Sequence, residues 1–72
     1  MFDRGKYGAR LRELRQSKHE NQGDLAEILS VTKTQVSDME NGKTATTLEK
    51  LVMICEHYQV SADYLLGLKD EP

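Results

Sequence analysis

This chain has few of the residues that cross-link or rigidify a protein. Its 72 residues include no tryptophan, one cysteine and one proline, which is the last residue. Because a single cysteine cannot form an internal disulfide, Cys55 fits a reducing cytosol. The sequence contains neither a run of about 18 apolar residues nor a signal-peptide pattern. We therefore expect no membrane role and no export, but a cytoplasmic protein.

The chain also lacks segments in which apolar and polar residues alternate, which is the pattern of a half-buried strand. No stretch resembles a linker, a repeat or a low-complexity tract. We predict a single all-α domain over residues 1–72, with five helices at about 6–18, 22–29, 33–41, 47–58 and 62–66. A core of this size supplies only a few kcal/mol of net stability, so dimerisation would help it.

Short polar residues mark the starts of the later helices. The predicted N-caps can each accept a hydrogen bond from the first turn: Asn21, Thr32, Thr46 or Thr47, and Ser61. Gln35 stands at the capping-box position of the third helix, and Asp24 favours the positive end of the second. The predicted apolar stripes are Tyr7, Leu11 and Leu14; Leu25, Ala26, Ile28 and Leu29; Val36 and Met39; Leu48, Leu51, Val52, Cys55 and Tyr58; and Leu65 and Leu66.

The charge is unevenly distributed along the chain. Ten basic and twelve acidic residues give a net charge of −2, which is unfavourable for a protein that neutralises phosphates. Residues 1–19, however, carry six basic residues against two acidic ones, while residues 44–72 carry two against five. A basic face can therefore exist on a protein whose total charge is negative.

Residues 22–41 have the layout of a helix-turn-helix. Two short helices are joined by a tight turn, and the second is polar on its leading face, which suits the major groove of DNA. Five motifs around this segment resemble the Cro and lambda-repressor-type, or Xre-like, family: Leu11-Arg12-Glu13-Leu14-Arg15, Gln22-x-x-Leu25-Ala26, Val31-Thr32, Glu40-Asn41-Gly42 and Val60-Ser61-x-x-x-Leu65-Leu66-Gly67. The resemblance spans about Tyr7 to Gly67 and implies a five-helix domain, the size of a Cro-type phage regulator, with the third helix as recognition helix.

The candidate base-reading residues are exposed near the start of the third helix: Lys33, Thr34, Ser37 and Asp38. Lysine donates to guanine, the threonine methyl group suits thymine, and aspartate accepts from the cytosine amino group. The resemblance implies that Lys33, Thr34 and Asp38 face base edges. The phosphate-contact candidates lie at the first turn of the second helix, in the capping box of the third and in the following loop: Gln22, Gln35, Asn41, Lys43 and Thr44.

The resemblance also implies an ion pair between Arg15 and Glu40 that clamps the first helix to the end of the third. If the pair is deeply buried, losing one partner would cost on the order of 3 kcal/mol. Cys55 lies on an apolar stripe and is expected to be a packed thiol. His19 and His57 lack other metal ligands at a suitable spacing. We expect no catalytic site, no metal, no cofactor and no small-molecule substrate.

Five positions depart from the usual family pattern. Glycine is common at three helix ends where this chain has His19, Ser30 and Gln59. Either the turns differ slightly from those of the family, or the backbone is left-handed and each of these residues costs roughly 1 kcal/mol. Glu20 replaces a usual apolar residue, and Thr46 replaces a usual proline.

Three functions are compatible with the sequence. The first is a repressor that binds double-stranded operator DNA as a homodimer, with its recognition helices about 34 Å apart in successive major grooves. Tyr58, Tyr64 and Leu68 are the candidate dimer contacts; alternatively, they only complete the core of the monomer. The second is an antirepressor that covers the DNA-binding surface of a companion repressor. The acidic balance, Asp38, and Glu20 and Asp24 beside the second helix favour it. The third is the antitoxin of a toxin pair.

Overall fold

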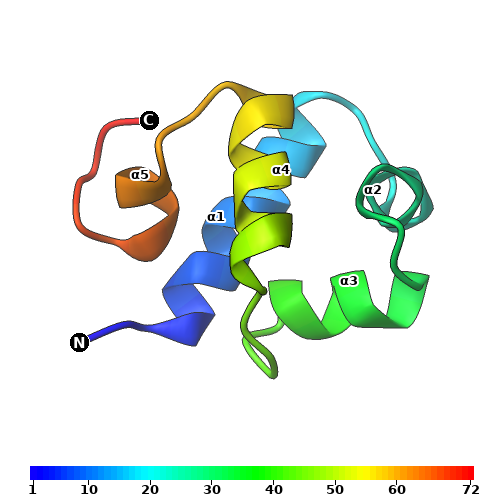
Figure 1. Cartoon of the computed structure of the whole chain (residues 1–72), viewed down its shortest axis with the longest axis horizontal. Coiled ribbons are helices and arrows are strands. Elements are labelled where there is room, and N and C mark those ends of the chain that lie inside the picture. Colours follow the sequence, from blue (N-terminus) through cyan, green and yellow to red (C-terminus); the bar gives the residue numbers. More distant parts are fainter.

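The computed structural model describes residues 1–72 and contains five helices. They are α1 (Arg4–Ser17), α2 (Gln22–Leu29), α3 (Lys33–Glu40), α4 (Leu48–Tyr58) and α5 (Ala62–Leu66). In Figure 1, α4 stands upright in the centre, with α2 and α3 on one side and α5 and both termini on the other. The predicted all-α class is confirmed, and each helix boundary lies within two residues of its predicted position. None of the helices is long and apolar enough to cross a membrane.

Each helix begins at a side chain that accepts a hydrogen bond from the backbone N–H three residues later. These N-caps are Asp3, Asn21, Thr32, Thr47 and Ser61. The helices α2 and α3 both have complete capping boxes. The caps of α2 to α5 agree with the sequence prediction, whereas the Asp3 cap starts α1 two residues earlier than predicted.

Three residues that replace the usual glycines have left-handed backbones. His19, Ser30 and Gln59 each have φ of 57°. Ser30 and Gln59 are the C-caps of α2 and α4, and His19 follows the C-cap of α1. Of the two alternatives, a different turn or a cost in stability, the structure shows the second, and the three left-handed residues together cost on the order of 3 kcal/mol.

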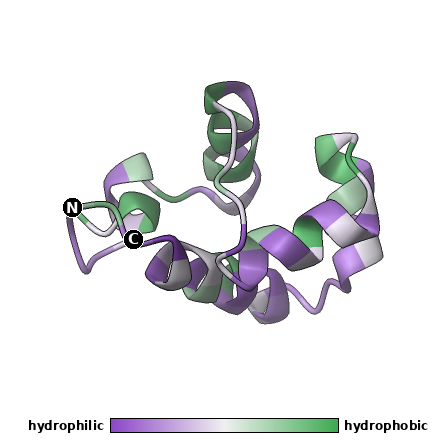
Figure 2. Cartoon of the chain, turned by 90° about the horizontal axis from the view of Figure 1, so that it is seen from below, coloured by the Kyte–Doolittle hydropathy of each residue, from purple (hydrophilic) through white to green (hydrophobic).

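Ten buried hydrophobic side chains form one core: Tyr7, Leu11, Leu25, Ala26, Leu29, Val36, Met39, Ile54, Tyr58 and Leu65. Every helix contributes side chains to this core. In Figure 2, which shows the molecule from below, the helices carry both hydrophobic and hydrophilic residues. The Thr46 hydroxyl forms a hydrogen bond with the hydroxyl of the buried Tyr7. Leu14 and Ile28 are partly buried at the edge of the core.

The predicted stripe of α4 is partly wrong. Leu48 and Val52 are 79% and 55% exposed, while Ile54, which the prediction left out, is fully buried. The helix turns Leu51, Ile54 and Tyr58, spaced by three and four residues, toward the core. Leu48 and Val52 thus remain on the surface, because the neighbouring helices fix the rotation of α4 and its own apolar residues extend around more than one face.

Gly8 allows α1 and α3 to approach closely. A Cβ atom at this position would lie 2.4 Å from the carbonyl oxygens of both Met39 and Glu40. No side chain fits there without moving the backbone of α3. The glycine therefore fixes the position of the carboxyl end of α3 against the middle of α1.

Candidate nucleic-acid interface

The turn between α2 and α3 holds the two helices as one unit. The left-handed Ser30 reverses the chain, and the Val31 N–H donates to the carbonyl of Ala26 at 2.9 Å. Thr32 then caps α3. Val36 and Met39 face the core, so the opposite face of α3 is open to solvent.

The outer face of α3 presents the candidate base-reading residues to different degrees. Lys33 and Thr34 are exposed and their side chains form no ion pair or hydrogen bond in the structure. Ser37 and Asp38 are less open: Asp38 is partly buried, and the Ser37 hydroxyl accepts a hydrogen bond from Asn41. Asp38 lines a shallow hollow beside the segment that leads from α3 to α4, together with Lys50. Lys33 and Thr34 are therefore the most accessible of the four candidates.

Several phosphate-contact candidates already have partners inside the protein. Gln35 accepts from the Thr32 N–H at 2.7 Å as part of the capping box. Gln22 donates to Glu40 at 3.2 Å. Asn41 accepts from Arg12 at 2.8 Å. By contrast, the side chains of Lys43 and Thr44 are exposed and form no such bond.

Glu40 lies at the centre of a charged network at the end of α3. Its side chain is fully buried and accepts two hydrogen bonds from Arg15, at 2.5 and 3.0 Å. Gln22 and Arg12 also donate to it, the latter at 3.5 Å. Burial alone would raise the pKa of the Glu40 carboxyl, but these hydrogen bonds and the Arg15 charge outweigh burial and lower it. The hydrogen bonds to Glu40 also raise the pKa of Arg15.

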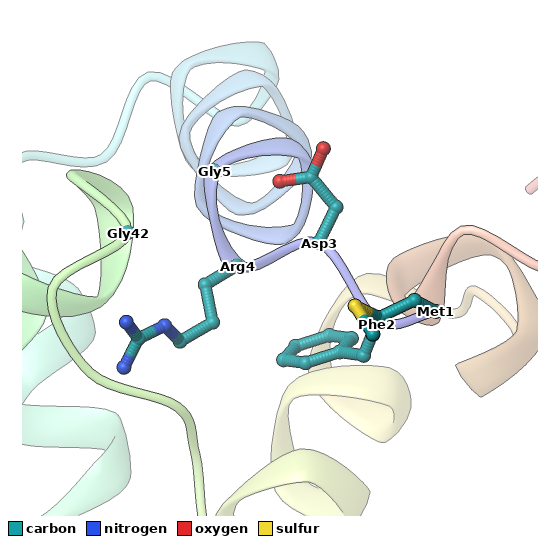
Figure 3. A pocket seen from close by; sticks show the side chains of 6 residues that line it. All are labelled: Met1, Phe2, Asp3, Arg4, Gly5 and Gly42. Atoms are coloured by element: carbon teal, nitrogen blue, oxygen red, sulfur yellow. The ribbon is translucent and has the colours of Figure 1, made fainter.

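Two cationic residues near this network were missed by the sequence analysis. The Arg12 side chain remains 42% exposed while it contacts Glu40 and Asn41. Arg4 donates to the carbonyl of Lys43 at 3.3 Å, and its side chain extends toward the loop after Gly42 (Figure 3). The excess of basic over acidic residues in the first helix is the signal that could have identified them.

The structure corrects the candidate dimer contacts. Tyr58 is only 6% exposed and donates to Glu20 at 2.6 Å, so it belongs to the monomer core. Glu20, which replaces an apolar residue, accepts from Tyr58 and also contacts His57 at 2.6 Å. Tyr64 is partly buried beneath the Arg10 guanidinium, 4.3 Å from its ring centre. Of the three candidates, only Leu68 is largely exposed, at 72%.

The remaining reactive residue is Cys55. It is free and partly buried, and burial raises the pKa of its thiol. A higher pKa leaves less of the nucleophilic thiolate at neutral pH. The structure contains no group of three His, Cys, Asp or Glu side chains placed to hold a metal ion.

The family assignment agrees with this geometry. The HTH_3 helix-turn-helix family matches residues 11–65, from the middle of α1 to within α5. The chain belongs to this family. The predicted resemblance to Cro and lambda-repressor-type regulators is thereby confirmed, together with the helix-turn-helix formed by α2 and α3.

Individual relatives are regulators of bacteria and phages. The chain is 38% identical over 66 residues to the uncharacterized HTH-type transcriptional regulator YobD of Bacillus subtilis, covering 92% of this chain and 59% of that protein. It is 33% identical over 57 residues to the ImmF control region 10 kDa protein of Bacillus phage phi105, covering 75% of this chain and 63% of that protein. This chain therefore spans about three fifths of the length of these relatives.

A solved structure with the same fold is that of the P22 c2 repressor in complex with a synthetic operator. It is 28% identical and superimposes with a TM-score of 0.81, covering 88% of this chain and 96% of the other. The two proteins thus share the arrangement of helices that places α3 at the surface.

Proposed function

We propose that this chain is a sequence-specific DNA-binding transcriptional regulator, of the type of a Cro-like phage or prophage repressor. The observation that carries the proposal is the outer face of α3, where Lys33 and Thr34 are exposed and unpaired at the leading end of a rigidly held helix. Membership of the helix-turn-helix family and the operator complex of the P22 c2 repressor support it.

The leading end of α3 would enter the major groove. There the Lys33 ammonium can donate to guanine O6 and N7, and the Thr34 methyl group can contact thymine. Each good contact of this kind is worth about 1–3 kcal/mol of discrimination against the wrong base. Ser37 and Asp38 are less accessible and would contribute less.

Backbone contacts would come from the cations around the end of α3. Arg4 and Arg12 approach this end from α1, and Lys43 leads out of it. We add Arg4 and Arg12 to the predicted phosphate contacts Lys43 and Thr44, because their guanidinium groups remain accessible beside the same loop. Gln22 would keep Glu40 in place, and Asn41 would keep Arg12 in place. Each would use its remaining hydrogen-bonding groups to contact phosphate.

The antirepressor alternative requires the outer face of α3 to meet a companion protein. Of the two acidic residues on α3, Glu40 is buried against Arg15 and Asp38 is partly buried. The accessible charges there are cationic, which favours a polyanion over the basic surface of a companion repressor.

The proposal can be tested by selecting DNA sequences from a random pool at ~150 mM salt, where specific and non-specific binding separate. The wild type should enrich one motif. The double substitution Lys33→Ala and Thr34→Ala should lose that motif and keep its helicity. Lys69→Ala is the matched control, because it removes a positive charge beyond α5. Enrichment of the same motif by the double variant would contradict the assignment of α3 as the reader.

The salt dependence of binding tests the backbone contacts. A variant that neutralises one phosphate fewer should show a slope of log affinity against log salt that is shallower by about 0.9. Arg4→Ala and Lys43→Ala should each produce this change while the selected motif stays the same. An unchanged slope in both variants would exclude the end of α3 from phosphate binding.

A further inference from the structure

A continuous apolar surface is formed by the amino-terminal arm, the start of α4 and the end of α5. Two adjoining hollows share Phe2 and Leu66; one of them extends to Leu68 and the other to Leu48. Val52 lies one turn further along α4 than Leu48, on the same side of the helix. We call the surface formed by Phe2, Leu48, Val52, Leu66 and Leu68 the arm–α4 face.

The fold leaves this face uncovered. Leu48 is 79% exposed, Leu68 is 72% exposed and Val52 is 55% exposed. The Phe2 ring is 43% exposed and lies beside Tyr7, with the ring centres 5.8 Å apart. Isolated exposed apolar residues are ordinary, but a continuous cluster of them marks an interaction surface. The charges beside the face indicate the chemistry of the partner.

Two acidic residues border the face on α4. Glu49 and Glu56 lie three and four residues from Val52, so they flank it on the surface of the helix. Both are exposed, and their side chains form no ion pair or hydrogen bond in the structure. They are seven residues apart, which places them on one side of α4 and about 10 Å apart along its axis. The outer edge of the face is therefore a row of free carboxylates.

The cations near the face already have partners. Lys6 is 3.8 Å from Asp70, and Lys69 is 3.8 Å from Asp63. Arg4 extends toward the loop that follows α3, where it donates to a backbone carbonyl (Figure 3). The carboxylates on α4 are thus not neutralised by the cations that lie closest to the face in the fold.

We infer that the arm–α4 face binds an amphipathic helix of another protein, apolar along one side and basic along the edge of that side. Such a helix would lie beside α4 and place its apolar residues, spaced by three and four positions, in the hollows. Two Lys or Arg residues seven positions apart would match the spacing of Glu49 and Glu56. In Figure 1 the amino terminus and α5 lie on the opposite side of α4 from α2 and α3. Binding of the helix therefore does not require DNA.

The same charges disfavour two other occupants of the face. A second copy of the chain would bring its own acidic edge to a two-fold contact, since such a contact places one surface against itself. A lipid surface with anionic headgroups repels carboxylates and attracts basic segments. A basic helix is the occupant that both the apolar area and the charge favour.

Two synthetic peptides test the inference on the full chain. The basic peptide, of about 18 residues, combines an apolar stripe with lysines seven positions apart along its edge. The acidic peptide differs only in having glutamate in place of these lysines. In fluorescence anisotropy at ~150 mM salt, the basic peptide should bind at least about tenfold more tightly than the acidic one.

Substitutions on α4 locate the contact. Glu49→Lys together with Glu56→Lys should invert the preference between the peptides, because each contact changes from attraction to repulsion. The matched control, Glu13→Lys together with Glu27→Lys, adds the same charge at exposed positions of α1 and α2 and should keep the wild-type preference. Leu48→Asn removes apolar area without changing the charge and should weaken binding of the basic peptide about tenfold. Circular dichroism should show wild-type helicity for every variant.

Three results would overturn the inference. The first is a wild type that binds both peptides equally or binds neither. The second is binding of the basic peptide that charge reversal on α4 leaves unchanged, or that shifts the amide resonances of α2 instead of those of Leu48, Val52 and Leu66. The third is a wild type that dimerises through this face in sedimentation velocity and thereby excludes the peptide, which would assign the face to a second copy. If the charge-reversed chain fails to fold, the amide shifts of the wild type decide the location.

Discussion

Replacing Glu40 with glutamine tests whether the charged network holds α1 to α3. The Glu40 side chain is fully buried and Arg15 donates to it twice, so the substitution leaves the guanidinium beside a neutral amide. Removing one partner of a buried pair costs about 3–5 kcal/mol. Arg15 keeps its hydrogen bond to the carbonyl of Glu20 at 2.7 Å, and glutamine keeps most of the shape, so we expect the lower end, about 3 kcal/mol.

A loss of this size is large for a domain of 72 residues. It should lower the melting temperature by roughly 12–24 °C, since each kcal/mol corresponds to about 4–8 °C at this chain length. Urea unfolding followed by circular dichroism measures the free energy directly. Glu13→Gln, the same chemical change on the exposed side of α1, should stay within about 0.5 kcal/mol of the wild type. If Glu40→Gln also stays within that limit, the network does not clamp the two helices.

Three further predictions concern the same fold. Gly8→Ala should destabilise the fold by about 2 kcal/mol, because the new Cβ would meet two carbonyl oxygens of α3. Gly5→Ala should leave the stability unchanged, because its Cβ would meet only the Asp3 carboxylate, at 3.3 Å. Thermal melts of the two variants test this difference. Ser30→Gly and Gln59→Gly should each stabilise by about 1 kcal/mol in urea titrations, and no gain would mean that these turns are unstrained. Folding lowers the pKa of Glu40, so its carboxylate should contribute fully to the stability of the fold above about pH 5. This contribution should be lost as the pH falls through the folded pKa of Glu40. A Glu40→Gln variant whose stability falls equally steeply with pH would contradict this.

The local features of the sequence predicted the helices well. N-capping depends on one side chain and the backbone three residues later, so Asn21, Thr32 and Ser61 could be recognised without knowledge of the fold. The left-handed backbones at Ser30 and Gln59 lie at helix ends where the family often has glycine, and only the structure decided their conformation. The caps, by contrast, are decided within a few residues of the chain.

Features set by packing between helices were not predictable in this way. The rotation of α4 depends on what α2 and α5 present to it, so Ile54 was left out of the core and Leu48 was placed in it. Tyr58 was placed on the apolar stripe and also among the candidate dimer contacts, and the sequence could not decide between them because its partner Glu20 is 38 residues away. Gly8 carried no signal, since a glycine within a helix has meaning only through the backbone that approaches it.

The candidate site shows the same division. Lys33 and Thr34 follow from the start of α3 and are exposed as expected. By contrast, the partner of Gln22 is Glu40 at the end of α3, and the partner of Asn41 is Arg12 of α1. No local sequence pattern brings these residues together. The close approach at Gly8 creates this junction, and the accessible cations Arg4 and Arg12 lie one turn to either side of it.

Several acidic side chains have partners inside the protein, which explains how a chain with a negative net charge can present a cationic face. Acidic side chains are used within the fold: Asp24 completes a capping box, Glu20 contacts His57 and Tyr58, and Glu40 is enclosed by Arg15. The C-terminal Asp70 is held by Arg10 at 2.9 Å, on the far side of α1 from α3. Part of the negative charge is thus compensated inside the protein or held away from α3, whereas Asp38 remains on α3 without an ion pair. The net charge of the chain consequently does not describe the field that a DNA backbone would meet there, which depends on a few accessible cations.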